Sequence, residues 1–354
     1  MKKVKIGIIG CGTIANNAHI PAYLKNPNVE IVYFCDIIEE KAKAAVEKYH
    51  CGKAVKDYHE VINDPEIDAV SICTPNSMHS VITINALNAK KHVLCEKPAA
   101  KTYKEALAMQ EAAHKNNCIL NIGVVNRFNN AVNIIKDIIA SGELGDIYSV
   151  YVSFRAHRSI PGIGGAFTTK AISGGGVLID WGVHYLDIVM YCLNDPQPKT
   201  VSAEAFCKLG KDIKNYTFTS MWSLETMDLN GTYDVDDYVT GLVRTSGPTI
   251  TFNGAWAQNI GVSETYIDFL GDKGGIRLQY GASFKIYSAK NGALMETTPS
   301  FNSTNHFENE INAFVDNVIH PEKRLPSHID TVIITAKMMQ AIYDSSDKHQ
   351  EITL

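Results

Sequence analysis

The feature of this sequence that most constrains its fold is an alternation of short apolar runs with helical patterns through the first 126 residues. The apolar runs predict strands, and the segments between them predict helices. Strands are expected at 4–10, 29–36, 68–75, 92–96 and 118–126, and helices at 39–50, 79–90 and 103–117. Unbroken apolar strands that alternate with helices are typical of a parallel sheet covered on both faces. The expected fold is therefore α/β, with a doubly wound N-terminal Rossmann domain over residues 1–126.

The pattern changes after residue 126. A helical segment at 129–145 precedes runs rich in β-branched and aromatic residues, several of them joined by tight turns that contain glycine. Such runs predict antiparallel strands, so residues 127–325 are expected to form an α+β domain with a large, mainly antiparallel open sheet. Residues 326–354 are expected to hold a C-terminal helix that returns toward the Rossmann domain. Because an open sheet has a face to cover, we expect a homodimer or homotetramer that forms through it.

Composition excludes several classes of function. The 354 residues carry a formal net charge of −5 and contain no lysine or arginine run that would bind nucleic acid. Glycines interrupt the apolar run near the N-terminus, and no apolar segment is long enough to cross a membrane. The eight cysteines include no Cys-x-x-Cys pair, which argues against a zinc site or a disulfide framework. We therefore expect a cytoplasmic protein without a bound metal ion.

A glycine-rich turn follows the first expected strand. The segment GCGTIA at 10–15 has the G-x-G-x-x-A form of the dinucleotide-binding fingerprint. In this motif the first glycine allows a tight turn, the second lets the backbone approach a pyrophosphate, and the alanine lets the helix pack closely on the strand. N–H groups at the start of the following helix would bind the phosphates. The sequence thus predicts a dinucleotide cofactor in contact with Gly10, Gly12, Thr13 and Ile14.

The end of the second expected strand bears on the choice of cofactor. Asp36 stands 26 residues after Gly10 (36 − 10), where a carboxylate accepts hydrogen bonds from the hydroxyls of the adenosine ribose. The same carboxylate would repel a 2′-phosphate, and Ile37 follows where arginine or serine would suit NADP. We therefore expect NAD rather than NADP, with Asp36 and Ile37 at the adenosine end. An exposed aspartate without a function is the alternative interpretation.

Three further expected strands also end in polar residues. Because ligands of a doubly wound sheet bind beyond the carboxyl ends of its strands, these ends should lie along the edge that binds the cofactor. The expected contacts at this edge are Thr74, Asn76, His79, Glu96, Lys97 and Arg127. Taken alone, the Glu-Lys-Pro run at 96–98 could instead be a strand that reaches the surface and turns.

A second informative stretch is SGGGVLIDWGVHYLD at 173–187. If it is helical, Asp180 and His184 lie one turn apart on the same face. A buried pair of this kind is often structural, and it could also supply two metal ligands, although no third or fourth ligand is evident. A catalytic role is the third interpretation. Histidine titrates near physiological pH and can take the proton of a hydroxyl, while a cation such as Lys97 would stabilise the developing alkoxide.

Four segments together resemble the Gfo/Idh/MocA family of oxidoreductases, which includes glucose–fructose oxidoreductase and inositol 2-dehydrogenase. They are GIIGCGTIA (7–15), CTPNSMH (73–79), CEKPAA (95–100) and GGGVLIDWGVHYLD (174–187). The resemblance covers nearly the whole chain, although the later sheet region matches in pattern only. It implies a Rossmann domain, an α/β domain with a large open sheet that is often buried in oligomers, and hydride transfer between NAD(P) and a sugar, cyclitol or related polyol.

The resemblance also implies roles for individual residues. His184 would be the catalytic acid/base, Lys97 would orient and polarise the reacting hydroxyl, and Asp180 would bond a substrate hydroxyl or tune its neighbours. Asn76 and His79 would lie near the nicotinamide half of the cofactor. The expected substrate contacts are Asn126, His157 and Trp181.

Three functions remain open. The leading one is an NAD-dependent dehydrogenase that acts on a hydroxyl of a sugar, cyclitol or glycoside. The second is a glycosidase or lyase in which tightly bound NAD oxidises the sugar transiently and a leaving group is expelled. The third is a non-catalytic NAD-binding regulator, which the presence of Lys97 and His184 disfavours. The glycine-rich loop at 155–173 is expected to set the substrate, and its residues do not indicate which one.

Overall fold

The computed structural model describes residues 3–219, 227–281 and 283–354. The chain divides into two compact units, each built from two separate stretches. Unit 1 comprises Met1–Phe128 and Thr304–Ile333, and unit 2 comprises Asn129–Ser303 and Ile334–Leu354. None of the described helices combines the length and the apolar character needed to span a membrane.

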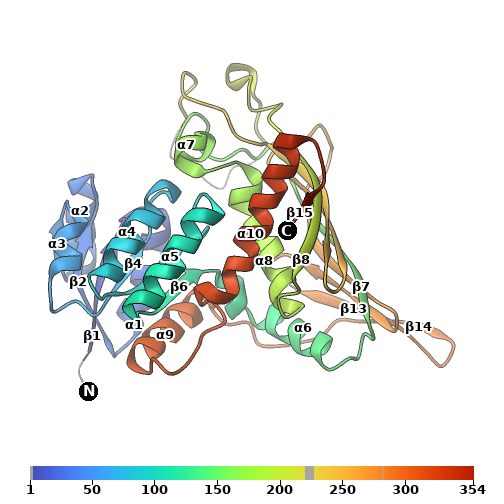
Figure 1. Cartoon of the computed structure of the whole chain (residues 1–354), viewed down its shortest axis with the longest axis horizontal. Coiled ribbons are helices and arrows are strands. Elements are labelled where there is room, and N and C mark those ends of the chain that lie inside the picture. Colours follow the sequence, from blue (N-terminus) through green and yellow to red (C-terminus); the bar gives the residue numbers. More distant parts are fainter. Residues whose placement is uncertain (1–2, 220–226, 282) are drawn as a thin grey trace. The chain divides into compact units, whose positions relative to one another are not determined.

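Unit 1 contains the predicted Rossmann sheet (Figure 1). Its six strands are all parallel and follow the order β3-β2-β1-β4-β5-β6. They are β1 (Val4–Ile9), β2 (Val29–Cys35), β3 (Lys53–Val55), β4 (Ala69–Ile72), β5 (His92–Glu96) and β6 (Leu120–Gly123). The strand order reverses between β1 and β4, and in such sheets ligands bind outside the carboxyl ends of the strands at this reversal.

The helices of unit 1 are α1 (Ile20–Lys25), α2 (Glu39–Tyr49), α3 (Tyr58–Asn63), α4 (Asn76–Asn88), α5 (Tyr103–Asn116) and α9 (His306–Ile319). A π-helical segment, Ala15–His19, leads into α1. Side-chain hydrogen bonds cap the starts of some of these helices. At the start of α5 the Thr102 hydroxyl accepts the N–H of Glu105, and the Glu105 carboxylate accepts the N–H of Thr102. This capping box satisfies two N–H groups that the helix itself leaves unpaired.

The last strand of the sheet, β6, is shorter than the sequence predicted. The strand expected at 118–126 is limited to β6, and Val125–Phe128 form a 3₁₀ helix instead. The chain that returns at residues 327–328 pairs with β6, with the N–H of Ile122 donating to the carbonyl of Ser327 (2.9 Å). The short elements β3 and α3 were not predicted, since three to six residues carry too little periodicity.

The division into units also differs from the predicted boundaries. The sequence placed residues up to 325 in the second domain, but α9 packs against α1 and the π-helical segment and therefore belongs to unit 1. Its apolar side chains Ile311, Phe314 and Val315 join the core beneath β1 and β2. Most of α10 (Ile329–Lys348) belongs to unit 2.

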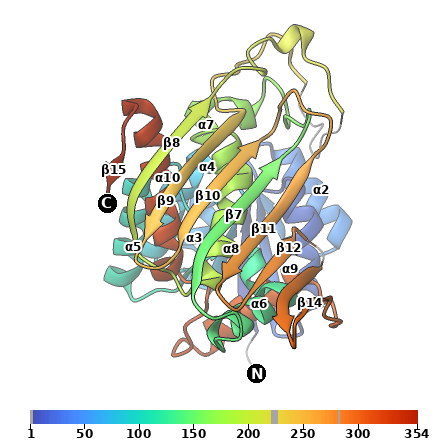
Figure 2. The same ribbon diagram turned by 90° about the vertical axis from the view of Figure 1, so that its right-hand side faces the viewer.

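Unit 2 contains a nine-stranded mixed sheet, as expected mainly antiparallel (Figure 2). Its order is β14-β13-β12-β11-β7-β10-β9-β8-β15, and only the β7–β10 pairing is parallel among the described strand pairs. The strands are β7 (Ile147–Arg155), β8 (Pro198–Phe206), β9 (Tyr238–Thr245), β10 (Thr249–Ala255), β11 (Glu264–Gly271), β12 (Gly274–Gln279), β13 (Phe284–Lys290), β14 (Ala293–Thr297) and β15 (Ile352–Thr353).

The two faces of this sheet have different chemistry, because alternate side chains of a strand point to opposite faces. Val150, Val152 and Phe154 of β7 are fully buried in the core of unit 2. The helices on that side are α6 (Asn130–Ala140), α8 (Val183–Cys192) and part of α10, with the short α7 (Lys170–Ser173) before α8. The opposite face, toward the viewer in Figure 2, is left uncovered by the described residues and carries aromatic and paired charged side chains.

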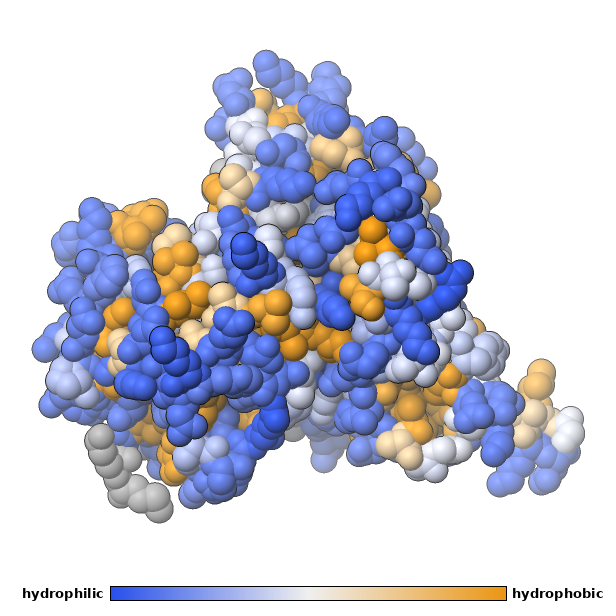
Figure 3. Space-filling view, in the orientation of Figure 1, coloured by the Kyte–Doolittle hydropathy of each residue, from blue (hydrophilic) through white to orange (hydrophobic). Residues whose placement is uncertain are grey.

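The β13–β14 hairpin reaches away from the rest of the sheet of unit 2 (Figure 3). Every residue of β14 is exposed, and Leu294 at its start has 92% of its surface accessible.

Candidate active site

The structure explains the two glycines of the fingerprint in different ways. Gly10 has a φ of 95°, and a Cβ there would lie 2.5 Å from the carbonyl oxygen of Cys73. A Cβ at Gly12 would meet no other atom of the described structure within 4 Å. The protein itself thus requires glycine at position 10, whereas position 12 faces open space. That space fits a pyrophosphate that comes close to the backbone, at the start of the helix that follows.

Asp36, directly after β2, is tied to the glycine turn. One carboxylate oxygen accepts the N–H of Cys11 (2.9 Å) and the other accepts the N–H of Ile38 (2.9 Å). Each oxygen keeps a further lone pair, which can accept a ribose hydroxyl. The neighbouring Ile37 has 81% of its surface exposed and offers an apolar face to a ligand. The arrangement fits the adenosine end of a dinucleotide.

His79 links two loops at the carboxyl edge of the sheet. Its Nδ1 lies 2.7 Å from the carbonyl oxygen of Pro98, and its Nε2 lies 2.9 Å from that of Thr74. Burial lowers the pKa of His79 against the opposing effect of these carbonyls, so at neutral pH the ring carries one proton and donates to one carbonyl at a time. Its contact with the nicotinamide stays a prediction, as does that of Asn76, the first residue of α4.

The Glu-Lys-Pro run forms a turn at the end of β5, and its Lys97–Pro98 peptide is cis. Glu96 is buried rather than surface-exposed. Its Oε1 lies 2.7 Å from Nε2 of His19, and its Oε2 accepts the backbone N–H of Lys97 (3.1 Å). Lys97 is half-buried. The carboxylate of the preceding residue therefore fixes the backbone of Lys97 at the point where the chain leaves the strand.

Arg127 and Asn126 both lie buried in the 3₁₀ helix after β6. Arg127 donates from Nη1 to the carbonyl oxygen of Pro326 (2.8 Å) and to the hydroxyl of Thr331 (3.2 Å). These bonds join the two separate stretches of the chain that make up unit 1. The expected cofactor contact of Arg127 and substrate contact of Asn126 stay predictions.

In unit 2 the glycines before the Asp-x-x-x-His motif make room for two buried polar groups. A Cβ at Gly176 would lie 1.8 Å from the carbonyl oxygen of Asp236, and one at Gly175 would lie 2.1 Å from the Tyr343 hydroxyl oxygen. The Asp236 carboxylate accepts the N–H groups of Gly176 (2.7 Å) and Leu178 (3.0 Å) and the Tyr343 hydroxyl (2.8 Å). It thus caps the start of the helix with a negative charge, the sign that a helix N-terminus favours.

The predicted helix in this stretch is present, with one feature that periodicity did not indicate. Residues 178–182 form a π-helical turn that leads into α8. Asp180 is buried in this turn, and the half-buried His184 lies in the first turn of α8, with its ring centroid 6.5 Å from that of Tyr280. π-Turns widen a helix locally and are frequent at functional sites.

The other predicted substrate contacts in unit 2 lie on less regular backbone. His157 follows β7, and its Nδ1 contacts the carbonyl oxygen of Ile260. Trp181 lies in the π-helical turn and packs partly buried against the core. The loop at 155–173 is anchored by the N–H of Lys170, which donates to the Asp234 carboxylate (2.6 Å), and by Gly164, where a Cβ would lie 2.0 Å from the carbonyl oxygen of Asp228. Its role in substrate choice stays a prediction.

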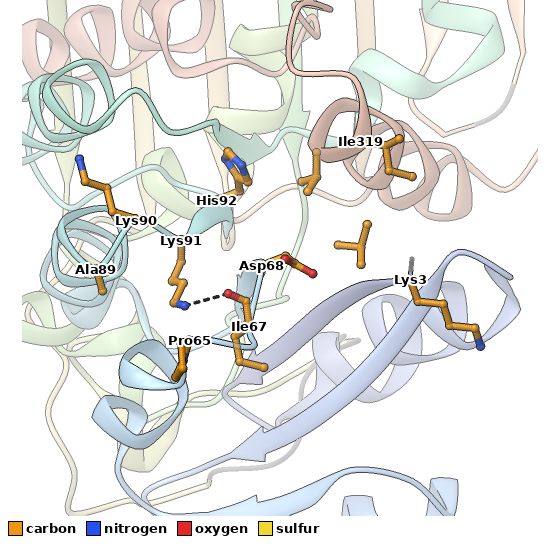
Figure 4. Close-up of a pocket in the computed structure, with 11 residues that line it drawn as sticks. Lys3, Pro65, Ile67, Asp68, Ala89, Lys90, Lys91, His92 and Ile319 are labelled. Carbon is orange, nitrogen blue, oxygen red and sulfur yellow. Dashed lines mark hydrogen bonds between the residues drawn. The ribbon is translucent and has the colours of Figure 1, made fainter. Parts of the chain in front are cut away.

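Neither a metal centre nor a second groove of the described residues offers a better cofactor site. No group of three or more histidine, cysteine, aspartate or glutamate side chains in the described ranges is arranged to hold a metal ion. A groove of about 520 Å³ lies at the amino ends of β1, β4 and β5 (Figure 4). Its Lys91 ammonium donates to the carbonyl oxygens of Asp64 (2.7 Å) and Ile67 (2.8 Å). This groove is at the opposite edge from the glycine turn, where a doubly wound sheet does not bind its dinucleotide.

Comparison with known proteins agrees with this geometry. Residues 4–124 match the model of an oxidoreductase family with an NAD-binding Rossmann fold, and residues 132–277 match that of the GFO/IDH/MocA C-terminal domain. D-glucoside 3-dehydrogenase of Escherichia coli K12 is 30% identical over 354 residues, which cover 99% of this chain and 97% of that protein. This chain belongs to the GFO/IDH/MocA oxidoreductase family. Membership confirms the resemblance seen in the sequence, and NAD as the cofactor.

Other members of the family match over part or all of the chain. Inositol 2-dehydrogenase of Salmonella typhimurium is 33% identical over 195 residues, 54% of this chain and 55% of that protein. Glucose-6-phosphate 3-dehydrogenase of Bacillus subtilis is 35% identical over 189 residues, 53% of each. The solved structure of levoglucosan dehydrogenase in complex with NADH and levoglucosan superimposes with a TM-score of 0.85 at 22% identity, covering 99% of both chains, and confirms the fold.

Sequence reasoning missed three residues that organise these sites, namely His19, Asp236 and Tyr343. All three act through contacts between segments far apart in the sequence, such as the 77 positions between His19 and Glu96. A weak signal existed for His19, which stands between the apolar residues Ala18 and Ile20 on a helix that must pack against the sheet. Asp236 and Tyr343 carry no comparable local pattern.

Proposed function

We propose that this chain is an NAD-dependent dehydrogenase that oxidises the C3 hydroxyl of a glucoside to a ketone. The observation that carries the proposal is the similarity to D-glucoside 3-dehydrogenase over nearly the full length of both chains. Glucose-6-phosphate 3-dehydrogenase, which is named for the same carbon, is a second relative. The cyclitol named by a third relative marks the wider substrate class, a ring that carries several secondary hydroxyls.

The residues of unit 1 that would hold NAD follow from their surroundings. The open space at Gly12 and the helix start at Thr13 suit the pyrophosphate, and the Asp36 carboxylate suits the adenosine ribose beside the exposed Ile37. Thr74, two residues after the end of β4, has a buried hydroxyl with no hydrogen-bond partner among the described residues. We assign Gly12, Thr13, Asp36, Ile37 and Thr74 to the cofactor on these grounds.

The reaction moves a hydride and a proton off one carbinol group. The residues assigned above would hold NAD, which would supply the acceptor for the hydride. In the proposed mechanism His184 takes the hydroxyl proton, because imidazole titrates near neutral pH. The Lys97 ammonium stabilises the negative charge that grows on the oxygen as the proton leaves. Asp180, buried one turn before His184, would bond a neighbouring substrate hydroxyl or stabilise the imidazolium once it forms.

A substrate panel tests the proposal. Methyl glucoside, glucose 6-phosphate, levoglucosan and myo-inositol are each incubated with NAD, while the absorbance of NADH is followed and the products are identified by NMR. We expect the highest kcat/KM with the glucoside and one 3-keto sugar for each NADH formed. Loss of the aglycone without net NADH would instead identify a lyase that recycles its bound NAD. No turnover of any of these compounds would contradict the proposal.

We also propose that the uncovered face of the nine-stranded sheet forms the interface of a homodimer or homotetramer. That face carries Tyr151 and Tyr266, whose ring centroids lie 5.9 Å apart, and Arg277, which stacks over Tyr266 and pairs with Asp268. Aromatic and arginine side chains are enriched in protein interfaces. Light scattering should give a mass of at least two chains, and Tyr266→Asp should lower it. A monomeric mass at micromolar concentration would contradict this interface.

A further inference from the structure

A histidine with no exposed surface lies directly behind the turn that carries Lys97. His19 occupies the last position of the π-helical segment Ala15–His19, and its side chain is fully buried. Both ring nitrogens have partners. Nδ1 lies 2.7 Å from the hydroxyl of Ser71 in β4, and Nε2 lies 2.7 Å from the carboxylate of Glu96 in β5. The ring therefore joins the helix after the glycine turn to two neighbouring strands.

The partner of His19 is held on its other side as well. The second carboxylate oxygen of Glu96 accepts the backbone N–H of Lys97 (3.1 Å). Gly123 lies opposite Glu96 in β6, and a Cβ there would come within 3.2 Å of the carboxyl carbon of Glu96. The carboxylate thus fills a space that the neighbouring strand leaves free by having glycine. Its position determines where the backbone of Lys97 leaves the strand.

The groups around His19 and Glu96 influence which of the two side chains favours a charged form. The titratable groups around the pair include Cys73 after β4, Tyr23 in α1, His79 in α4, Cys95 in β5, Lys97 after β5 and Glu310 in α9. Burial works against charge on His19, but Cys73 and Glu96 outweigh it and raise its pKa well above the ordinary value. Burial likewise opposes charge on Glu96, yet His19 and Lys97 keep its pKa low. Both directions favour the ionised form of the pair, an imidazolium beside a carboxylate.

Glu310 is the contrasting group in the same region. It is also buried, and neither of its carboxyl oxygens has a hydrogen-bond partner among the described residues. Burial and the nearby Glu96 raise the pKa of Glu310 well above its ordinary value, although His19 acts against the rise. Glu310 is therefore the neutral acid and Glu96 the ion, which makes the two residues a matched pair of test positions.

We propose that His19 is a positioning residue for Lys97, which acts by fixing the Glu96 carboxylate that holds the lysine's backbone N–H. The inference rests on the proposed function, in which Lys97 is catalytic. Stability alone does not account for the arrangement, because a buried ion pair is a weak stabiliser compared with apolar side chains of the same volume. A fixed backbone at Lys97 matters for catalysis, since a misplacement of about 1 Å can lower a rate about 100-fold.

The direct test is His19→Gln in the full-length enzyme. Glutamine keeps a hydrogen-bond donor near Glu96 but removes the positive charge. We expect kcat to fall by about 100-fold, the loss that a misplaced catalytic group can cause, while the dissociation constant of NAD stays close to that of the wild type. Glu310→Gln is the matched control, because an amide replaces a neutral acid of the same shape. It should keep wild-type kcat.

A second measurement does not depend on turnover. In the enzyme without substrate, ¹⁵N NMR of labelled histidine should show both ring nitrogens of His19 protonated at neutral pH. The stability difference between wild type and His19→Gln should also depend on pH. It should be largest between the ordinary pKa values of Glu96 (4.5) and His19 (6.5). It should shrink below that range as Glu96 takes up a proton, and above it as pH passes the raised pKa of His19.

If His19→Gln does not fold, Gly123→Ala replaces it, because the added methyl group presses on the Glu96 carboxyl without removing a polar group. We expect a smaller loss of kcat with unchanged affinity for NAD. A neutral His19 ring in the NMR spectrum, or wild-type kcat in both variants, would overturn the inference. So would a loss in Glu310→Gln equal to that in His19→Gln. If Lys97→Ala keeps full turnover while His19 is doubly protonated, the proposed catalytic role of Lys97 fails instead.

Discussion

The two π-helical segments, one in each unit, hold residues with proposed roles by different means. The segment Ala15–His19 in unit 1 places an imidazole inside the protein, where a side-chain ion pair with Glu96 fixes it. The segment at 178–182 in unit 2 is fixed at its start through backbone N–H groups that the Asp236 carboxylate accepts. Unit 1 should therefore be sensitive to changes of charge, and unit 2 to added volume at the glycines that admit Asp236 and Tyr343.

The largest effect is expected for a change that removes the acid/base of unit 2. In His184→Gln, no group of suitable pKa takes the hydroxyl proton, and general acid–base catalysis contributes about 10²- to 10⁴-fold. We expect kcat to fall by about 1000-fold with NAD affinity unchanged. Initial rates of NADH formation with the best substrate measure the loss. A variant with wild-type kcat would show that His184 has no catalytic role.

The volume sensitivity of unit 2 is tested by Gly176→Ala. The new Cβ would lie 1.8 Å from the carbonyl oxygen of Asp236, and backbone on both sides must move. We expect the free energy of unfolding to fall by about 3 kcal/mol, as for a strongly overpacked site. Thermal denaturation measures the change. Gly12→Ala is the matched control, since its Cβ meets no described atom within 4 Å. It should keep stability and weaken NAD binding; an equal loss of stability in both variants would contradict the comparison.

The charge sensitivity of unit 1 is tested at the other end of the cofactor by Asp36→Ser. The change removes a carboxylate that would accept ribose hydroxyls and repel a 2′-phosphate. We expect the dissociation constant of NAD to rise about tenfold, as for the loss of a charged hydrogen bond of about 1.5 kcal/mol, and that of NADP to fall. Titration with both cofactors measures the two constants. A wild-type enzyme that already prefers NADP would contradict the role given to Asp36.

The smallest effect is expected for a change at a residue to which no catalytic or binding role is given. Thr102→Ala removes the hydroxyl that caps α5 and should lower the free energy of unfolding by about 1 kcal/mol. Since α5 carries no proposed catalytic residue, kcat and the affinity for NAD should not change. Denaturant titration and the standard rate assay check the two expectations. A parallel loss of kcat would mean that general destabilisation, rather than local chemistry, explains the effects expected above.

How far the sequence predicted the molecule depended on the range of the interactions involved. The Rossmann strands and the Asp180–His184 helix were predictable, because periodicity and glycine turns are local properties of the chain. The place of α9 in unit 1 was not predictable, because its amphipathic pattern indicates an apolar face but not the surface against which that face packs. The hydrogen bond from the Tyr343 hydroxyl to the Asp236 carboxylate was not predictable either, because the two residues are 107 positions apart.

Within the candidate site, the sequence predicted which residues would carry chemistry but not how they are held. The role of Lys97 was predicted from its position at a strand end and stays a prediction, whereas the burial of Glu96 and its bond to His19 depend on the packing of three segments. For His79 the structure shows a structural contact where the sequence predicted a ligand contact. It was expected near the nicotinamide, and its ring nitrogens face two backbone carbonyls, a role that the sequence could not distinguish from ligand binding.

The most direct test of the account is the turnover of Lys97→Ala, measured together with its affinity for NAD. If the lysine stabilises the developing alkoxide, kcat should fall by about 100- to 1000-fold, the usual loss for one preorganised electrostatic contact, and the dissociation constant of NAD should stay near that of the wild type. A Lys97→Ala enzyme that produces NADH at the wild-type rate would contradict the account.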